Sequence, residues 1–87
     1  MSKGNAKELK DHEPVAVIYA REKAGLTKAD VARELGVTLS LISQIESGKR
    51  NATPAMIRRL AQVFNCPVVV LERKRYPVGP DGEEAAA

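Results

Sequence analysis

The sequence predicts a small all-α domain, a compact bundle of five short helices. Apolar residues recur at the three- and four-residue spacing of a helix face, and Gly or Pro interrupts this spacing at short intervals. Several of the interruptions also carry residues that favour helix N-caps. With 87 residues, of which 44% are hydrophobic, the chain has material for one modest core. It is too short for a large enzyme with a deep catalytic cleft.

The first helix is expected to begin at Pro14, because proline lacks an N–H that the first turn leaves unpaired in any case. It runs to about Ala24 and ends at Gly25, a residue that tolerates positive φ. Ile18 and Tyr19 are predicted to face the core.

Residues 28–47 predict two helices joined by a very short turn. Thr27 and Asp30 have the spacing of a capping box, which starts the first of the two. Gly36 ends that helix, and Thr38 is an N-cap candidate for the next. Such a pair is typical of a helix-turn-helix, in which two helices cross steeply. The apolar contacts between them are expected from Val31, Leu35, Val37, Ile42 and Ile45.

The C-terminal part of the domain predicts one clear helix and one ambiguous segment. Thr53 and Pro54 form an N-cap followed by proline in the first turn, a strong helix start. The buried stripe of this fourth helix consists of Ile57, Leu60, Ala61 and Phe64. Residues 68–71 contain four branched side chains in a row, which suit a strand as well as a short fifth helix.

Charge divides the chain into three parts. Residues 13–76, the predicted domain, contain eleven Lys or Arg against six Asp or Glu, whereas residues 77–87 contain only acidic charges, three in number. We expect residues 1–12 to be a flexible tail and residues 77–87 a disordered acidic tail. A basic domain is typical of a protein with a polyanionic partner, although an ordinary solvated surface would look the same.

Several functional classes are excluded by what the sequence lacks. No apolar run approaches the roughly 20 residues of a membrane span, and the polar first twelve residues do not resemble a secretory signal. The lone Cys66 cannot form an internal disulfide, which suits the cytoplasm. His12, the only histidine, lies in the predicted tail without partners for a metal or an acid–base pair. We therefore expect a cytoplasmic protein that is not an enzyme and holds no metal or cofactor.

A series of short motifs runs through the segment from Tyr19 to Leu71. They are Arg21-Glu22-Lys23, Gly25-Leu26-Thr27, Val31-Ala32, Leu35-Gly36-Val37, Ile42-Ser43, Ile45-Glu46, Gly48-Lys49-Arg50-Asn51 and Leu60-Ala61. With these motifs the segment resembles the lambda-repressor-like (Cro/CI, Xre-type) helix-turn-helix DNA-binding domains. The resemblance implies that the second and third helices read DNA. It also implies a transcription regulator, commonly a repressor, that binds a palindromic operator as a homodimer.

By this resemblance, the third helix enters the major groove and places Leu39, Ser40, Ser43 and Gln44 against base edges. Gln44 can pair with two atoms of adenine, and Ser40 can contact several bases. Leu39 can offer only an apolar contact to a thymine methyl group, where the family often has Gln or Arg. The alternatives are that Leu39 packs on a neighbouring helix and that the polar residues form an ordinary solvated face.

Phosphate contacts need cations and N–H groups. The resemblance assigns them to Lys28, Thr38, Ser47, Lys49, Arg50 and Asn51. Lys28 stands where the family often has a Gln. The resemblance also implies a structural ion pair between Arg21 and Glu46.

Two questions about partners stay open at this point. The dimer interface is assigned to Val69, Val70, Arg73 and Tyr76, where a strand could pair with its symmetry mate. The alternative function is an antitoxin-like or adaptor module whose main target is another protein, bound through the acidic tail at residues 77–87.

Overall fold

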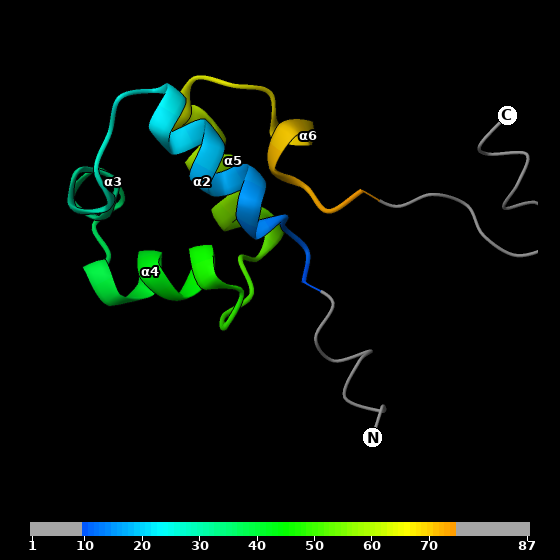
Figure 1. The fold of residues 1–87 in the computed structure, drawn as a ribbon, viewed down its shortest axis with the longest axis horizontal. Coiled ribbons are helices and arrows are strands. Elements are labelled where there is room, and N and C mark those ends of the chain that lie inside the picture. Colours follow the sequence, from blue (N-terminus) through cyan, green and yellow to red (C-terminus); the bar gives the residue numbers. More distant parts are fainter. Residues whose placement is uncertain (1–9, 75–87) are drawn as a thin grey trace, which may run out of the picture.

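A computed structural model describes residues 10–74 and arranges them as five helices (Figure 1). These are α2 (Pro14–Lys23), α3 (Lys28–Leu35), α4 (Leu39–Ser47), α5 (Pro54–Phe64) and α6 (Val68–Leu71). The all-α prediction is confirmed for this part of the chain, and the ambiguous segment is the helix α6. None of these helices has the length and apolar character needed to cross a membrane.

Three threonines start three of the helices. The hydroxyl groups of Thr27, Thr38 and Thr53 each accept a hydrogen bond from the backbone N–H three residues later. At α3 the capping box is complete, because the Thr27 N–H also donates to the Asp30 carboxylate over 2.8 Å. Hydrogen bonds from the Thr27 backbone and hydroxyl and from Arg33 lower the pKa of Asp30. The helix starts predicted from the sequence are thus made by local side-chain contacts.

The turn between α3 and α4 depends on glycine. Gly36 has φ of 71°, a left-handed conformation that costs glycine little because it has no Cβ. The Val37 N–H then donates to the Ala32 carbonyl over 2.9 Å, which closes the end of α3. Only residues 36–38 therefore separate α3 from α4. In Figure 1, α3 is seen nearly end-on while α4 runs across the view.

The core lies where α3 packs on α4 and α5, and where α2 packs on α4 and α6. Its largest fully buried apolar side chains are Val17, Val31, Ile42, Ile45, Ile57, Leu60 and Leu71.

One sequence prediction about the core is wrong. Tyr19 is 62% exposed, Ile18 is half-buried, and Val17 and Ala20 face the core in their place. The side of α2 that faces the core is the side that contacts α4. Arg21 and Val17 share this side, and Arg21 reaches Glu46 of α4 from it. Tyr19 lies on the opposite side.

The N-terminal segment corrects a second prediction. His12, placed in the flexible tail by the sequence, is 1% exposed. Its Nε2 lies 2.8 Å from the Ile45 carbonyl oxygen, and its Nδ1 accepts the Ala52 N–H over 3.2 Å. Because a carbonyl can only accept and an N–H can only donate, these partners set a neutral ring with the proton on Nε2.

Backbone hydrogen bonds tie the same segment to the end of the domain. The Glu13 N–H donates to the Leu71 carbonyl, and the Arg73 N–H donates to the Asp11 carbonyl, each over 2.9 Å. The ordered domain therefore includes residues 10–12. The remainder of the predicted N-terminal tail, Tyr76 and the predicted partner-binding tail at residues 77–87 lie outside the described residues.

Candidate nucleic-acid interface

The four predicted base-reading residues lie on one side of α4. They follow one another at i, i+1, i+4 and i+5, and the opposite side of the helix carries buried Ile42 and Ile45. Leu39 is 50% exposed, so half of its side chain remains available for an apolar contact. Ser40 is exposed, and Ser43 and Gln44 are half-buried.

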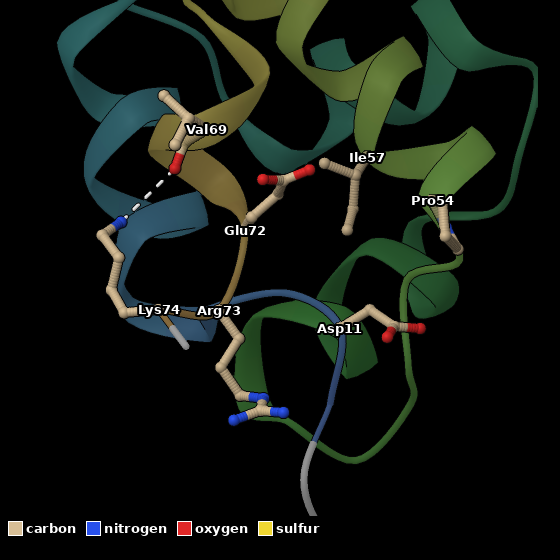
Figure 2. Close-up of a pocket in the computed structure, with 7 residues that line it drawn as sticks. All are labelled: Asp11, Pro54, Ile57, Val69, Glu72, Arg73 and Lys74. Carbon is tan, nitrogen blue, oxygen red and sulfur yellow. Dashed lines mark hydrogen bonds between the residues drawn. The ribbon is translucent and has the colours of Figure 1, made fainter. Parts of the chain in front are cut away.

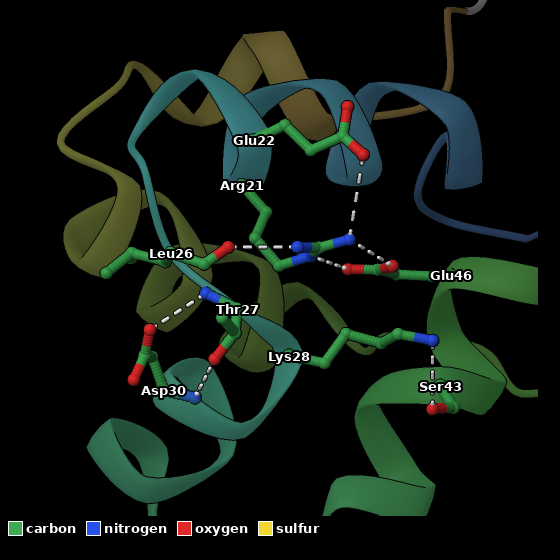
Figure 3. Close-up of polar contacts among 8 residues, drawn as sticks. All are labelled: Arg21, Glu22, Leu26, Thr27, Lys28, Asp30, Ser43 and Glu46. Carbon is green, nitrogen blue, oxygen red and sulfur yellow. Dashed lines mark hydrogen bonds and ion pairs between the residues drawn. The ribbon is translucent and has the colours of Figure 1, made fainter.

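Two cations predicted to bind phosphates contact predicted base-reading residues. The Lys28 Nζ, from the start of α3, lies 3.5 Å from the Ser43 hydroxyl (Figure 3). The Arg50 Nε donates to the Gln44 Oε1 over 3.2 Å. The predicted base-reading and phosphate-binding sets therefore form one continuous surface.

The end of α4 folds the basic loop back onto the helix. Gly48 has φ of 82°, and beyond it the N–H groups of Lys49 and Arg50 donate to the Gln44 carbonyl over 2.9 and 3.2 Å. The Ser47 hydroxyl donates to the same oxygen over 3.1 Å. Lys49 and Arg50 are exposed on a loop whose backbone is held against α4.

Asn51 has a structural contact that the sequence did not predict. Its Oδ1 accepts the Asp11 N–H over 2.7 Å, and its Nδ2 donates to the Asp11 carboxylate over 2.9 Å. The side chain therefore joins the basic loop to the N-terminal segment. Its assignment to phosphate stays a prediction, and binding through the amide would have to compete with Asp11.

The N-terminal end of α4 is suited to an anion. Thr38 caps it, and the first turn carries no acidic residue. The positive end of the helix dipole is therefore not opposed by a nearby carboxylate.

The structure pairs Arg21 with Glu46 in a nearly buried contact (Figure 3). Arg21 Nε and Nη2 donate to the two carboxylate oxygens of Glu46 over 2.6 and 3.2 Å, and Nη1 donates to the Leu26 carbonyl over 2.9 Å. Hydrogen bonding to Glu46 raises the pKa of Arg21. Glu46 is the one acidic residue of α4, so this pair also removes the only carboxylate that α4 could present to DNA.

The residues assigned to dimerisation separate into two environments. Val69, 60% exposed, and Arg73 line an open hollow of about 410 Å³ beside α5 and α6 (Figure 2). Val70 is half-buried against the core on another side of α6. The hollow is lined by Asp11, Pro54, Ile57, Val69, Glu72, Arg73 and Lys74.

Comparison with known proteins agrees with this geometry. The helix-turn-helix family matches residues 17–71, a range that includes all five helices apart from the first residues of α2. A competence pilus inhibition repressor from Acinetobacter baylyi is 36% identical over 53 residues, which are 61% of this chain and 48% of the relative. The matching segment thus spans about half of that protein. No solved structure matches the chain significantly. The chain belongs to the lambda-repressor-like, Xre-type helix-turn-helix family of DNA-binding domains.

Proposed function

We propose that this protein is a sequence-specific transcriptional regulator, a repressor, that binds a palindromic operator as a homodimer. The observation that carries the proposal is the surface of α4. There, four predicted base-reading positions lie beside Lys28, Lys49 and Arg50, and the only acidic side chain of the helix is buried in an ion pair. The similarity to a repressor supports the regulatory role.

In this proposal α4 enters the major groove. Gln44 and Ser40 supply hydrogen bonds to base edges, and Leu39 contacts a thymine methyl group. Around them, Lys28, Thr38, Ser47 and the loop from Lys49 to Asn51 position the helix on the phosphates, which fixes its register but carries no sequence information.

Replacing a phosphate-binding and a base-reading residue is expected to give different results. Lys49→Ala should weaken binding to all duplexes alike and reduce the slope of log affinity against log salt by about one. Gln44→Ala should instead relax the preference at one base pair, at a cost of about 1–3 kcal/mol on the best site. The measurement is a set of binding titrations over several salt concentrations and operator variants.

Lys23→Ala is the matched control, because Lys23 lies at the end of α2 on the side away from α4, where it lines a cavity with Val63 and Cys66. It removes the same charge and should change the affinity much less than Lys49→Ala does. The proposal fails if the Lys49 and Gln44 variants behave identically, or if the wild-type protein prefers no duplex.

The dimer interface is proposed at the hollow of Figure 2. Its lining carries two carboxylates and two cations around Val69, a composition that two copies related by a two-fold axis can match reciprocally. It also adjoins the basic loop, because Asp11 is bonded to Asn51. Two reading helices could then face the same side of the duplex with half-sites roughly 34 Å apart.

Val69→Asp is expected to raise the dimer dissociation constant about tenfold or more, because the docked interface would bury a carboxylate in place of an apolar side chain. Val15→Asp is the control, since Val15 is also strongly exposed but lies on α2. Sedimentation analysis gives the association state, and titration of single and paired half-sites gives the effect on DNA. Equal association of both variants and wild type would exclude this interface.

A further inference from the structure

We infer that Arg50 is a positioning residue for base recognition: it sets the direction in which Gln44 presents its amide to the base pair. The inference rests on the proposed DNA-binding function. It gives Arg50 a second role besides the attraction of phosphate.

The backbone holds Arg50 at Gln44. After the left-handed Gly48, the Arg50 N–H donates to the Gln44 carbonyl over 3.2 Å, and the neighbouring Lys49 N–H donates to the same oxygen. The Arg50 side chain therefore starts within reach of the Gln44 side chain and needs no long-range packing to find it. Its Nε lies 3.2 Å from the Gln44 Oε1.

The chemistry of the two groups makes this contact directional. A guanidinium group only donates hydrogen bonds, so it selects the oxygen end of the amide and turns the NH₂ end away. Without such a partner, rotation of the amide by half a turn exchanges a donor for an acceptor at the base edge. Arg50 removes this ambiguity before DNA arrives.

The contact leaves Gln44 able to read a base. A carbonyl oxygen has two lone pairs, so Oε1 can hold Arg50 with one and accept from an adenine amino group with the other, while the NH₂ group donates to the ring nitrogen. Holding a side chain in its bound conformation improves binding by reducing the ordering cost. Here it also penalises any base pair that needs the opposite amide orientation.

Lys49 provides a matched comparison. It is exposed on the same loop with the same charge, and within residues 10–74 its ammonium group makes no hydrogen bond to a base-reading side chain, whereas Lys28 contacts Ser43. The Lys49→Ala variant therefore measures the effect of removing one positive charge while the Gln44 amide stays positioned by Arg50.

The experiment compares wild type with Arg50→Ala, Arg50→Lys, Lys49→Ala, Gln44→Ala and the double variant Gln44→Ala/Arg50→Ala. Each protein is titrated with a selected operator and with operators that carry each of the other base pairs at one position. That position is the one at which Gln44→Ala changes the preference. Arg50→Ala and Arg50→Lys should both reduce discrimination at that pair about threefold to tenfold, the range for one hydrogen bond. Lysine is expected to fail here because it has a methylene group where arginine has the Nε that meets Gln44. Arg50→Lys should keep the salt dependence of wild type, because the charge is retained.

Two further results are expected. Lys49→Ala should weaken binding to all duplexes alike and leave the discrimination between base pairs unchanged. When Gln44 is already alanine, Arg50→Ala should cause no further loss of discrimination. Melting temperatures, expected to be alike for all variants, show that the fold is unaffected.

The possible contradictions are distinguishable. If the Arg50 variants weaken binding evenly, as Lys49→Ala does, or change discrimination at a different base pair, the positioning role is wrong and DNA binding stands. If Gln44→Ala changes discrimination nowhere, the inference and the base-reading role of Gln44 both fail. If wild type prefers no duplex, the proposed function itself fails.

Discussion

His12→Ala is expected to lower the free energy of unfolding by about 3 kcal/mol or more. The substitution removes a buried ring, leaves the Ala52 N–H without its partner and takes away one of the hydrogen bonds of the Ile45 carbonyl. A buried group without a hydrogen bond costs about 1–3 kcal/mol, and the cavity adds to this. For a domain of this size, the melting temperature should fall by at least about 12 °C. Thermal and denaturant unfolding measure the effect.

Two amide variants separate the contributions of the ring nitrogens. Asparagine at position 12 can place its oxygen where Nδ1 accepts from Ala52, whereas glutamine can place its NH₂ group where Nε2 meets Ile45. The Ile45 carbonyl also accepts the Gly48 N–H, so it keeps a hydrogen bond when His12 is replaced, whereas the Ala52 N–H loses its partner. His12→Asn should therefore recover more stability than His12→Gln. Melting temperatures within a degree or two of wild type for all three variants would contradict the buried role of His12.

Glu46→Ala is expected to destabilise the fold by about 2–4 kcal/mol. The Arg21 and Glu46 side chains are only 12% and 6% exposed, so removing the carboxylate leaves a positive charge with little access to water. Its remaining contacts would be the Leu26 carbonyl and the Glu22 carboxylate at 4.0 Å. Thermal unfolding at neutral pH measures the loss, and an unchanged melting temperature would contradict it.

The control is an exposed ion pair in the same domain. Arg33 pairs with Asp30 over 2.6 Å, and its side chain is 70% exposed. Arg33→Ala should cost at most about 1 kcal/mol, the usual range for such pairs. The double variant Arg21→Met/Glu46→Leu should be more stable than Glu46→Ala, because it leaves no stranded charge.

These two contacts also connect stability with the proposed interface. His12 binds the backbone at both ends of the turn that carries Lys49 and Arg50, and Arg21 holds the last part of α4. Residues outside the proposed interface therefore keep α4 and its basic loop together. Variants at these positions should be compared for DNA binding only at temperatures where they are folded.

The sequence by itself determined α2 to α5 and the turn between α3 and α4, whereas residues 68–71 suited a strand as well as the helix α6. The caps at Thr27, Thr38 and Thr53 and the left-handed turns at Gly36 and Gly48 depend on residues only a few positions apart. Such local contacts are visible as short motifs, because the backbone geometry of a helix end brings these residues together in any protein.

Only the tertiary structure decided which side of α2 is buried and what His12 does. Apolar spacing allowed Tyr19 to face the core, whereas packing on α4 turned Val17 and Ala20 inward. The partners of His12 lie 33 and 40 residues away along the chain, and no local pattern carries that information. An imidazole is polar enough for a solvated tail and apolar enough for a core, so its place depends on whether the folded chain supplies a donor and an acceptor for its two nitrogens.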